Sequence, residues 1–189
     1  MINKGNIGDA FEAKARKNAL EVCRALMHGK WEVICRGPDG KEKWRDTIEN
    51  DWVNVGLNEL LDKFFKGSAY TAAHYIGITG TTPSPASGDT MASHGGWTEV
   101  TAYDEGVRQD FTPGSVSGQS VDNSLSKATF TIDTNSTTVG GAFLCTDDTK
   151  GGSGGVLISV GAFTAGDKSL DDNDTLDVQV TYSAADDGA

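Results

Sequence analysis

The chain has 189 residues, of which 37% are hydrophobic, and its formal net charge is −11. This composition suits one medium domain with an apolar core, or a smaller domain with an appended arm. The negative charge argues against a nucleic-acid-binding surface, because neutralising phosphates requires clustered Lys and Arg.

The charge is unevenly distributed along the chain. Residues 1–66 carry 12 Lys and Arg and 11 Asp and Glu, a balance of +1. Residues 67–189 carry 4 and 16, a balance of −12. Such an asymmetry is a hint of two surfaces with different partners, although an acidic soluble face beside a mixed one explains it equally well.

The cysteines and the apolar runs bear on the compartment. Cys23, Cys35 and Cys145 lie far apart, with neither a zinc-site spacing nor a disulfide framework. The N-terminus lacks the apolar core of a signal peptide, and no apolar run approaches the ~20 residues of a membrane-spanning helix. We therefore expect folding in a reducing cytosol and no membrane partner.

Residues 6–28 are predicted to form an amphipathic helix. Asp9 and Glu12 have the spacing of an N-terminal capping pair, and Gly29 is a suitable end. One apolar face of this helix could pack on the core of its own domain, or the helix could be an arm, residues 1–29, that docks on a neighbouring subunit. Apolar residues recur at helical spacing, at Ile7, Phe11, Ala15, Ala19, Val22, Cys23 and Leu26. The candidate partner-binding residues are Ile7, Phe11, Val22 and Leu26.

Residues 30–67 are predicted to form two strands and a short helix. "KWEVICR" and "EKWRDTIEN" alternate in polarity around the turn "GPDGK". One face of the first strand would hold Trp31, Val33 and Cys35, and one face of the second Trp44, Asp46 and Ile48. "DWVNVGLNELLDKFFKG" predicts a helix near residues 52–66 that ends at Gly67. Its buried side would consist of Val53, Leu57, Leu60, Leu61, Phe64 and Phe65.

Residues 68–189 are predicted to be rich in β-strands. Short runs of Val, Ile, Thr and Phe alternate with turn signals, which is typical of a sandwich or barrel. "TLDVQVTYS" alternates cleanly and would point Leu176, Val178, Val180 and Tyr182 inward. The predicted fold class is α+β, mainly β. It is either an antiparallel β sandwich or a jelly-roll-like barrel, and residues 30–189 form the β-rich domain.

No catalytic or metal-binding constellation emerges from the sequence. His28, His74 and His94 have no Ser, Cys or carboxylate at an activating spacing. "DDNDTLD" lacks the central Gly and the terminal Glu of a helix-loop-helix calcium site. "KGGSGGVLIS" precedes a strand rather than a helix, so it does not predict a phosphate site. We expect no enzymatic activity, no metal and no cofactor.

The stretch "GDTMASHGGWTEVTAY", residues 88–103, has neither a helical nor a strand period. Met91 and Trp97 are predicted to anchor a long irregular connection onto the core, with His94 bonded to backbone groups of the loop. Gly95 and Gly96 would permit backbone angles or close approaches that other residues cannot adopt. Contact with a partner subunit is the alternative role for this loop.

These residues resemble structural proteins of tailed bacteriophages. "GDTMASHGGWTE" is similar to a motif of those proteins, in which a "VVNxGLNxLLD"-like helix and a "WYxGL"-like strand precede it. The corresponding pieces here are "DWVNVGLNELLDKFF" (51–65) and "HYIGITG" (74–80). Downstream, "ATFTID", "VGGAFLCTDDTKGG", "LISVGAF" and "DTLDVQVTYS" resemble their C-terminal strands. The resemblance covers about residues 30–184 and does not extend to residues 1–28.

The resemblance implies a virion structural protein assembled in the host cytoplasm. The first hypothesis is a head decoration (cement) protein that binds the major capsid protein on the capsid surface, as a homotrimer, with no nucleic-acid partner. The second is a tail-fibre or receptor-binding tail component, with the loops "TTPSPASG" and "TKGGSGG" as tips. A capsule or cell-wall hydrolase and a head–tail adaptor are further alternatives.

Overall fold

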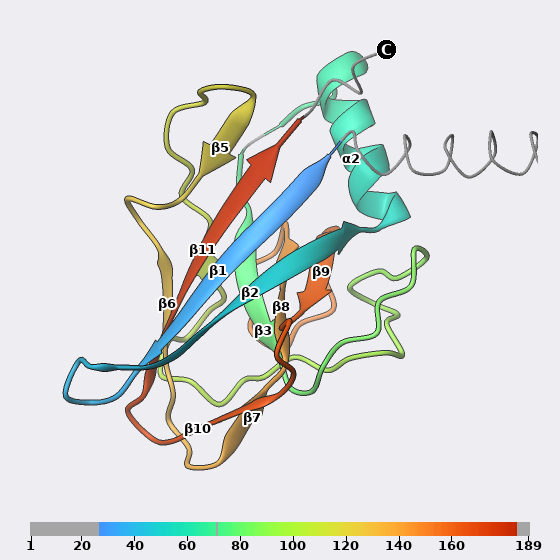
Figure 1. Cartoon of the computed structure of the whole chain (residues 1–189). Coiled ribbons are helices and arrows are strands. Elements are labelled where there is room, and N and C mark those ends of the chain that lie inside the picture. Colours follow the sequence, from blue (N-terminus) through green and yellow to red (C-terminus); the bar gives the residue numbers. More distant parts are fainter. Residues whose placement is uncertain (1–26, 71, 185–189) are drawn as a thin grey trace, which may run out of the picture.

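The computed structural model describes residues 27–70 and 72–184 (Figure 1). The candidate residues Ile7, Phe11, Val22 and Leu26, and with them the predicted N-terminal helix, lie outside this part of the chain. The elements are β1 (His28–Arg36), β2 (Glu42–Trp52), α2 (Asn54–Phe65), β3 (Tyr75–Thr79), β4 (Gln109–Asp110), β5 (Ser120–Asp122), β6 (Ala128–Thr131), β7 (Thr137–Val139), β8 (Gly141–Cys145), β9 (Leu157–Ala162), β10 (Lys168–Leu170) and β11 (Thr175–Ser183).

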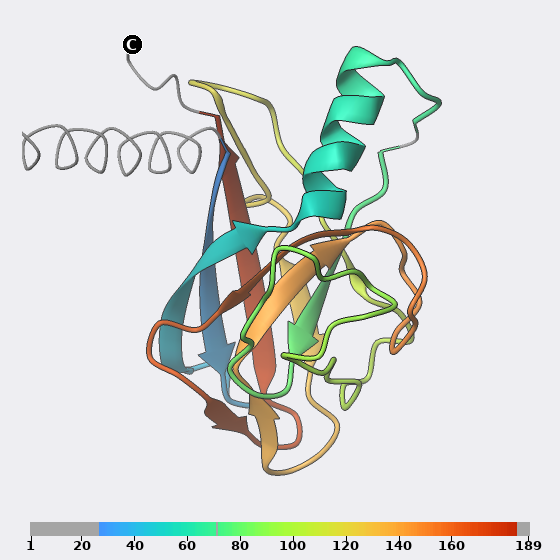
Figure 2. The same ribbon diagram turned by 90° about the vertical axis from the view of Figure 1, so that its right-hand side faces the viewer.

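The strands form one large antiparallel sheet that curls into a half-barrel (Figure 2). Its order is β4-β3-β8-β9-β2-β1-β11-β5, with β6 also paired to β11 and with β10 and β7 forming a separate small sheet. This arrangement confirms the predicted α+β, mainly β class with one short helix near residues 52–66.

The long strands β1, β2 and β11 follow the alternation of their sequences. In β1 the inward residues Trp31, Val33 and Cys35 are fully buried. Val33 pairs with Val178 of β11 on one side and with Asp46 of β2 on the other. The predicted inward residues of β11 are also buried: Leu176, Val178, Val180 and Tyr182. Because one face of these strands meets the core and the other meets solvent, period-two patterning specifies their orientation.

The two halves of the sheet pair along the second half of β2, where an isolated bridge also joins Ile48 to Phe163. There Asp51 pairs with Val160 and Trp52 with Ser159 of β9. Elsewhere the layer of β1, β2 and β11 diverges from the layer of β3, β8 and β9 (Figure 2). The main core fills the space between the two layers. It contains Trp31, Ile48, Ile78, Phe130, Ile132, Ala142, Leu144 and Leu176, among others.

Strands β8 and β9 are buried on both faces. All five residues of β8 are buried, as are the first five of β9. One face packs on the main core, and the other packs on a second cluster of Val53, Met91, Trp97, Phe143, Cys145, Leu157 and Val160. Burial on two faces explains why "GAFLC" and "LISVGA" show no alternation.

The prediction that Gly29 ends a helix is wrong, because Gly29 lies within β1. His28 and Gly29 are the first residues of β1 and pair with Ser183 and Tyr182. A Cβ at Gly29 would collide with the Asn50 side chain and would lie 2.8 Å from the Tyr182 ring. The glycine is therefore explained by the close approach of neighbouring side chains, and β1 begins two residues earlier than predicted.

The predicted buried side of α2 is the second correction. Val53 and Gly56 are buried, but the exposed fraction is 52% for Leu61 and 76% each for Phe64 and Phe65. The first turn of α2 lies on β9, and beyond it the helix extends past the ends of the strands (Figure 2). The amphipathic pattern was recognised correctly, but the described residues do not cover its apolar face.

A buried ion pair ties three loop segments together. The Arg108 side chain is fully buried and donates to both carboxylate oxygens of Glu99, at 2.9 and 2.7 Å. It also donates to the backbone oxygens of Asp147 at 2.8 Å and Gly152 at 2.6 Å, and lies over the Phe143 ring. No sequence motif marks this arginine. Its guanidinium satisfies four acceptors in the loops around β8.

We predict that Arg108→Met lowers the free energy of unfolding by about 3–5 kcal/mol, because it leaves the Glu99 carboxylate buried without its cation. Urea unfolding measures the loss. Arg45→Met is the matched control, since the Arg45–Glu42 pair at 2.6 Å is largely exposed and its loss should cost about 1 kcal/mol or less. Equal losses in the two variants would contradict the assigned role of Arg108.

Candidate interaction surface

Helix α2 presents an apolar stripe to solvent. Its large side chains lie at spacings of three and four, at Leu57, Leu60, Leu61, Phe64 and Phe65. Their exposed fractions range from 38% for Leu57 and Leu60 to 76% for the two phenylalanines, whose rings contact edge to face at 4.9 Å. Scattered exposed apolar residues are normal on a protein surface, but a contiguous patch of this kind marks an interaction site.

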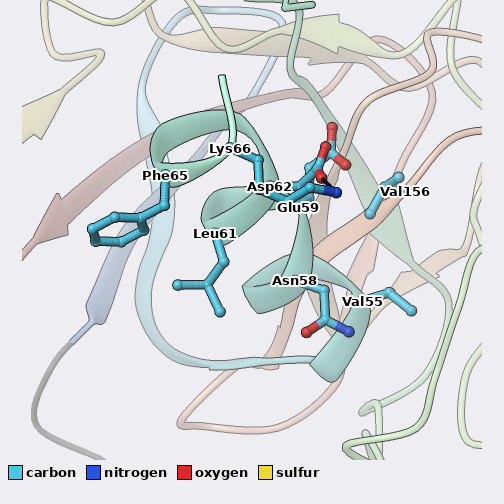
Figure 3. A pocket seen from close by; sticks show the side chains of 8 residues that line it. All are labelled: Val55, Asn58, Glu59, Leu61, Asp62, Phe65, Lys66 and Val156. Carbon is cyan, nitrogen blue, oxygen red and sulfur yellow. Dashed lines mark ion pairs between the residues drawn. The ribbon is translucent and has the colours of Figure 1, made fainter. Parts of the chain in front are cut away.

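One flank of the helix borders a hollow of about 630 Å³, here called the outer hollow. Figure 3 shows Leu61 and Phe65 projecting on one side of α2, with Glu59, Asp62 and Lys66 toward Val156. The Lys66 ammonium lies 2.7 Å from the Asp62 carboxylate. The remaining lining residues are Val55 and Asn58. An apolar centre with charged residues at its edge is the usual anatomy of a protein–protein contact.

The opposite flank of α2 forms one wall of a second cavity, of about 360 Å³, between the helix and the sheet. We call this cavity the inner groove. The helix contributes Leu60, Lys63 and Phe64 to its wall. The other lining residues, most of them apolar or aromatic, are Met27, Trp52, Gly56, Glu59, Tyr70, His74, Phe111, Leu144, Ile158 and Tyr182. They come from seven separate stretches of sequence, which the fold brings together.

A small polar network lies beneath the inner groove. The Tyr182 hydroxyl is 2.7 Å from Ser159 Oγ and accepts a hydrogen bond from Asn50 Nδ2 at 3.3 Å. Burial raises the pKa of the Tyr182 phenol far above its ordinary value. The Trp52 ring packs edge-on against Tyr182 at 5.5 Å. The neutral phenol is thus held by hydrogen bonds, and the two aromatic rings pack against each other in the lining of the groove.

His74 lies at the edge of the inner groove. Burial lowers its pKa, and the carboxylate of Glu59 opposes that shift more weakly. The imidazole is therefore neutral at pH 7, which agrees with its apolar surroundings. Tyr70, with its ring centroid 6.2 Å from that of His74, is 53% exposed at the mouth of the groove.

The residues nominated in the "GDTMASHGGWTE" stretch lie together on the outer face of β8 and β9. Met91 and Trp97 are 2% and 4% exposed and belong to the second apolar cluster. The His94 ring stacks on Trp97 at 3.7 Å between centroids, and its Nδ1 lies 3.1 Å from the Trp97 backbone oxygen. Trp97 in turn packs on Phe143 at 4.9 Å.

The two glycines of this stretch differ in their surroundings. A Cβ on Gly96 would collide with the backbone oxygen of Ser84, whose amide donates to the Gly96 oxygen at 3.1 Å. A Cβ on Gly95 would meet nothing within 4 Å. Close packing therefore requires a glycine at position 96 but not at position 95. The Gly96–Ser84 contact holds the proline-containing segment 81–87 against the loop.

Two further kinds of site were sought in residues 27–70 and 72–184. These residues contain no group of three or more His, Cys, Asp or Glu side chains placed to hold a metal ion. Helix α2 is too short and too polar to cross a membrane. Within this part of the chain, the flanks of α2 are the most distinctive surface.

Comparisons with protein-family models, curated proteins and solved structures found no match to this chain. The candidate surface is consequently assigned from its own geometry and from the sequence resemblance alone.

Sequence reasoning did not find the inner groove. Trp52, Tyr70, Phe111 and Tyr182 are separated by up to 130 residues, and their runs of sequence share no motif. The signal that was present is the apolar stripe of α2, which was interpreted as core. The apolar stripe of an amphipathic helix has the same sequence pattern whether another element covers that face or the face is exposed to solvent.

We predict that Gly96→Ala lowers the thermal unfolding midpoint, because its Cβ would force the loop away from Ser84. The expected loss of about 1–3 kcal/mol corresponds to overpacking in a tight region. Gly95→Ala is the matched control and should change stability by about 0.5 kcal/mol or less. Differential scanning calorimetry of the three proteins measures the effect, and equal midpoints would contradict the assigned packing.

Proposed function

We propose that this protein is a bacteriophage virion structural protein, specifically a decoration protein that binds the major capsid protein on the outer surface of the head. The observation that carries the proposal is the exposed apolar flank of α2 beside the outer hollow. The resemblance of residues 30–184 to phage structural proteins supplies the class of partner.

The outer flank of α2 supports a binding role rather than a catalytic one. Leu61 and Phe65 are exposed side chains on a helix whose first turn is held by backbone hydrogen bonds to Ser87 and Ile158. The Asn54 amide donates to Ser87 at 2.8 Å and the Val53 amide to Ile158 at 3.3 Å. A preorganised helix loses little conformational entropy on binding. Aromatic and aliphatic anchors surrounded by charges are the usual energetic centres of an interface.

A decoration role also accounts for the physical character of the chain. A protein that binds only the assembled shell stabilises it by mass action. Many copies on a symmetric lattice add avidity, so each contact surface can be small. The proposal includes a cyclic homotrimer, the symmetry expected for a protein placed on local threefold axes of a head.

The experiment is co-sedimentation of the purified chain with phage heads that lack it, titrated to saturation. We expect binding at a fixed ratio to capsid subunits and a higher melting temperature of the heads. Absence of binding by the folded chain would overturn the decoration role, and recovery of the protein with tails would assign it to the tail.

A double substitution tests the proposed surface. Leu61→Ser with Phe65→Ser should weaken head binding about 30-fold or more, since loss of a central anchor costs about 2 kcal/mol. The control pair is Val116→Ser with Leu125→Ser, because these residues are 75% and 95% exposed but line neither cavity. If both double variants bind as tightly as the wild type, α2 is not the contact surface.

A further inference from the structure

The inner groove is distinct from the outer flank assigned to the capsid. Its mouth is formed by Leu60, Phe64 and Tyr70, which are 38%, 76% and 53% exposed. Its floor consists of Trp52 and Tyr182. At about 25 cal/mol per Å² of apolar surface, covering three such side chains stabilises a complex appreciably. The groove therefore has the shape and polarity to receive an apolar segment.

The chain itself leads into this groove. Met27, the first residue that the structure describes, is one of the lining residues. Residues 1–26 are thus joined directly to the rim without an intervening linker. A segment attached in this way has a high effective concentration at the site, which no free partner matches at ordinary protein concentrations.

The sequence of residues 1–26 is suited to the groove. Its apolar stripe ends at Val22, Cys23 and Leu26, the members nearest Met27 along the chain. The two parts of the chain also carry net charges of opposite sign. Residues 1–26 carry five Lys and Arg and three Asp and Glu, a balance of +2, whereas residues 27–184 carry 11 and 22, a balance of −11.

We propose that residues 1–26 of the same chain cover the inner groove, with Val22 and Leu26 seated against Leu60, Phe64 and Tyr70. The occupant is an intramolecular one. Two of the residues nominated from sequence for a partner contact would then serve the chain's own domain, while Ile7 and Phe11 lie farther from the attachment point. This inference is independent of the virion role and holds or fails on the purified protein.

The native cysteines allow a direct test. Cys35 and Cys145 are buried, and burial raises the pKa of the Cys35 thiol to about 11 and also raises that of Cys145. Both are therefore protonated at pH 8, which leaves Cys23 as the native thiol to pair with an introduced one. A disulfide requires the two Cα atoms to approach within about 7 Å.

The test compares Lys63→Cys with Lys66→Cys in the full chain. Lys63 lines the inner groove, whereas Lys66 lines the outer hollow and is the more exposed of the two. Neither change removes an apolar wall residue. When the protein is oxidised at low concentration at pH 8, we expect a disulfide from Cys23 to position 63 to form at least tenfold faster than a disulfide from Cys23 to position 66. Mass spectrometry identifies the linked peptides, and the rates are normalised to the reaction of each thiol with glutathione.

Three results would overturn the proposal. Equal rates at the two positions would show that residues 1–26 do not occupy the groove. A faster reaction at position 66 would place the segment on the outer flank. Linkage at position 63 that appears only in covalent dimers would show that a second copy supplies the segment. Cys23→Ser in the Lys63→Cys protein should abolish the linked species in every case.

Discussion

The architecture depends on one short crossing between β2 and β9. The residue pairs Asp51–Val160 and Trp52–Ser159 join the two layers of the sheet, and an isolated bridge between Ile48 and Phe163 extends the contact. The backbones can approach because glycine stands at the closest points: a Cβ on Gly161 would collide with Ile48, and one on Gly56 with the backbone of Ile158. The crossing closes one side of the core. It also determines where β2 ends and α2 begins, so the helix emerges at the end of the central strands, with an apolar stripe that the described residues leave uncovered.

The outer face of β8 and β9 is closed by loops rather than by another layer of sheet. Met91 and Trp97 bury their side chains there, and the Arg108–Glu99 pair holds the neighbouring segments in place. A buried ion pair is weak evidence for stability, because desolvation offsets most of the attraction. Its geometry instead specifies one arrangement of the loops, since the four acceptors of the guanidinium are satisfied together only when the segments around Asp147 and Gly152 meet.

Sequence patterns predicted the elements of this fold better than their surroundings. Alternation of polar and apolar residues identified the inward face of β1 and β11, because one face of those strands meets solvent and the other meets the core. The same reasoning placed α2 within about two residues but assigned its stripe to the core, since periodicity records that a face is apolar and not what covers it. The role of Gly29 is hidden for a related reason: Asn50, whose close approach requires the glycine, lies 21 residues away on the neighbouring strand. The inner groove was beyond local patterns altogether, because residues such as Trp52 and Phe111 meet only in the folded chain.

The two flanks of α2 differ in ways that suit two different occupants. The inner groove is concave, floored by aromatic rings, and begins at Met27, so it fits a narrow segment that arrives along the chain. The outer flank borders the larger outer hollow, where Leu61 and Phe65 project beside the Asp62–Lys66 ion pair, and such a surface fits a broader partner. If a segment fills the groove, it also packs against the flank of α2 that faces away from the outer hollow. The helix would then present its outer flank with less freedom to move, and the cost of ordering it on binding would fall. Intramolecular covering of one flank would thereby strengthen binding through the other.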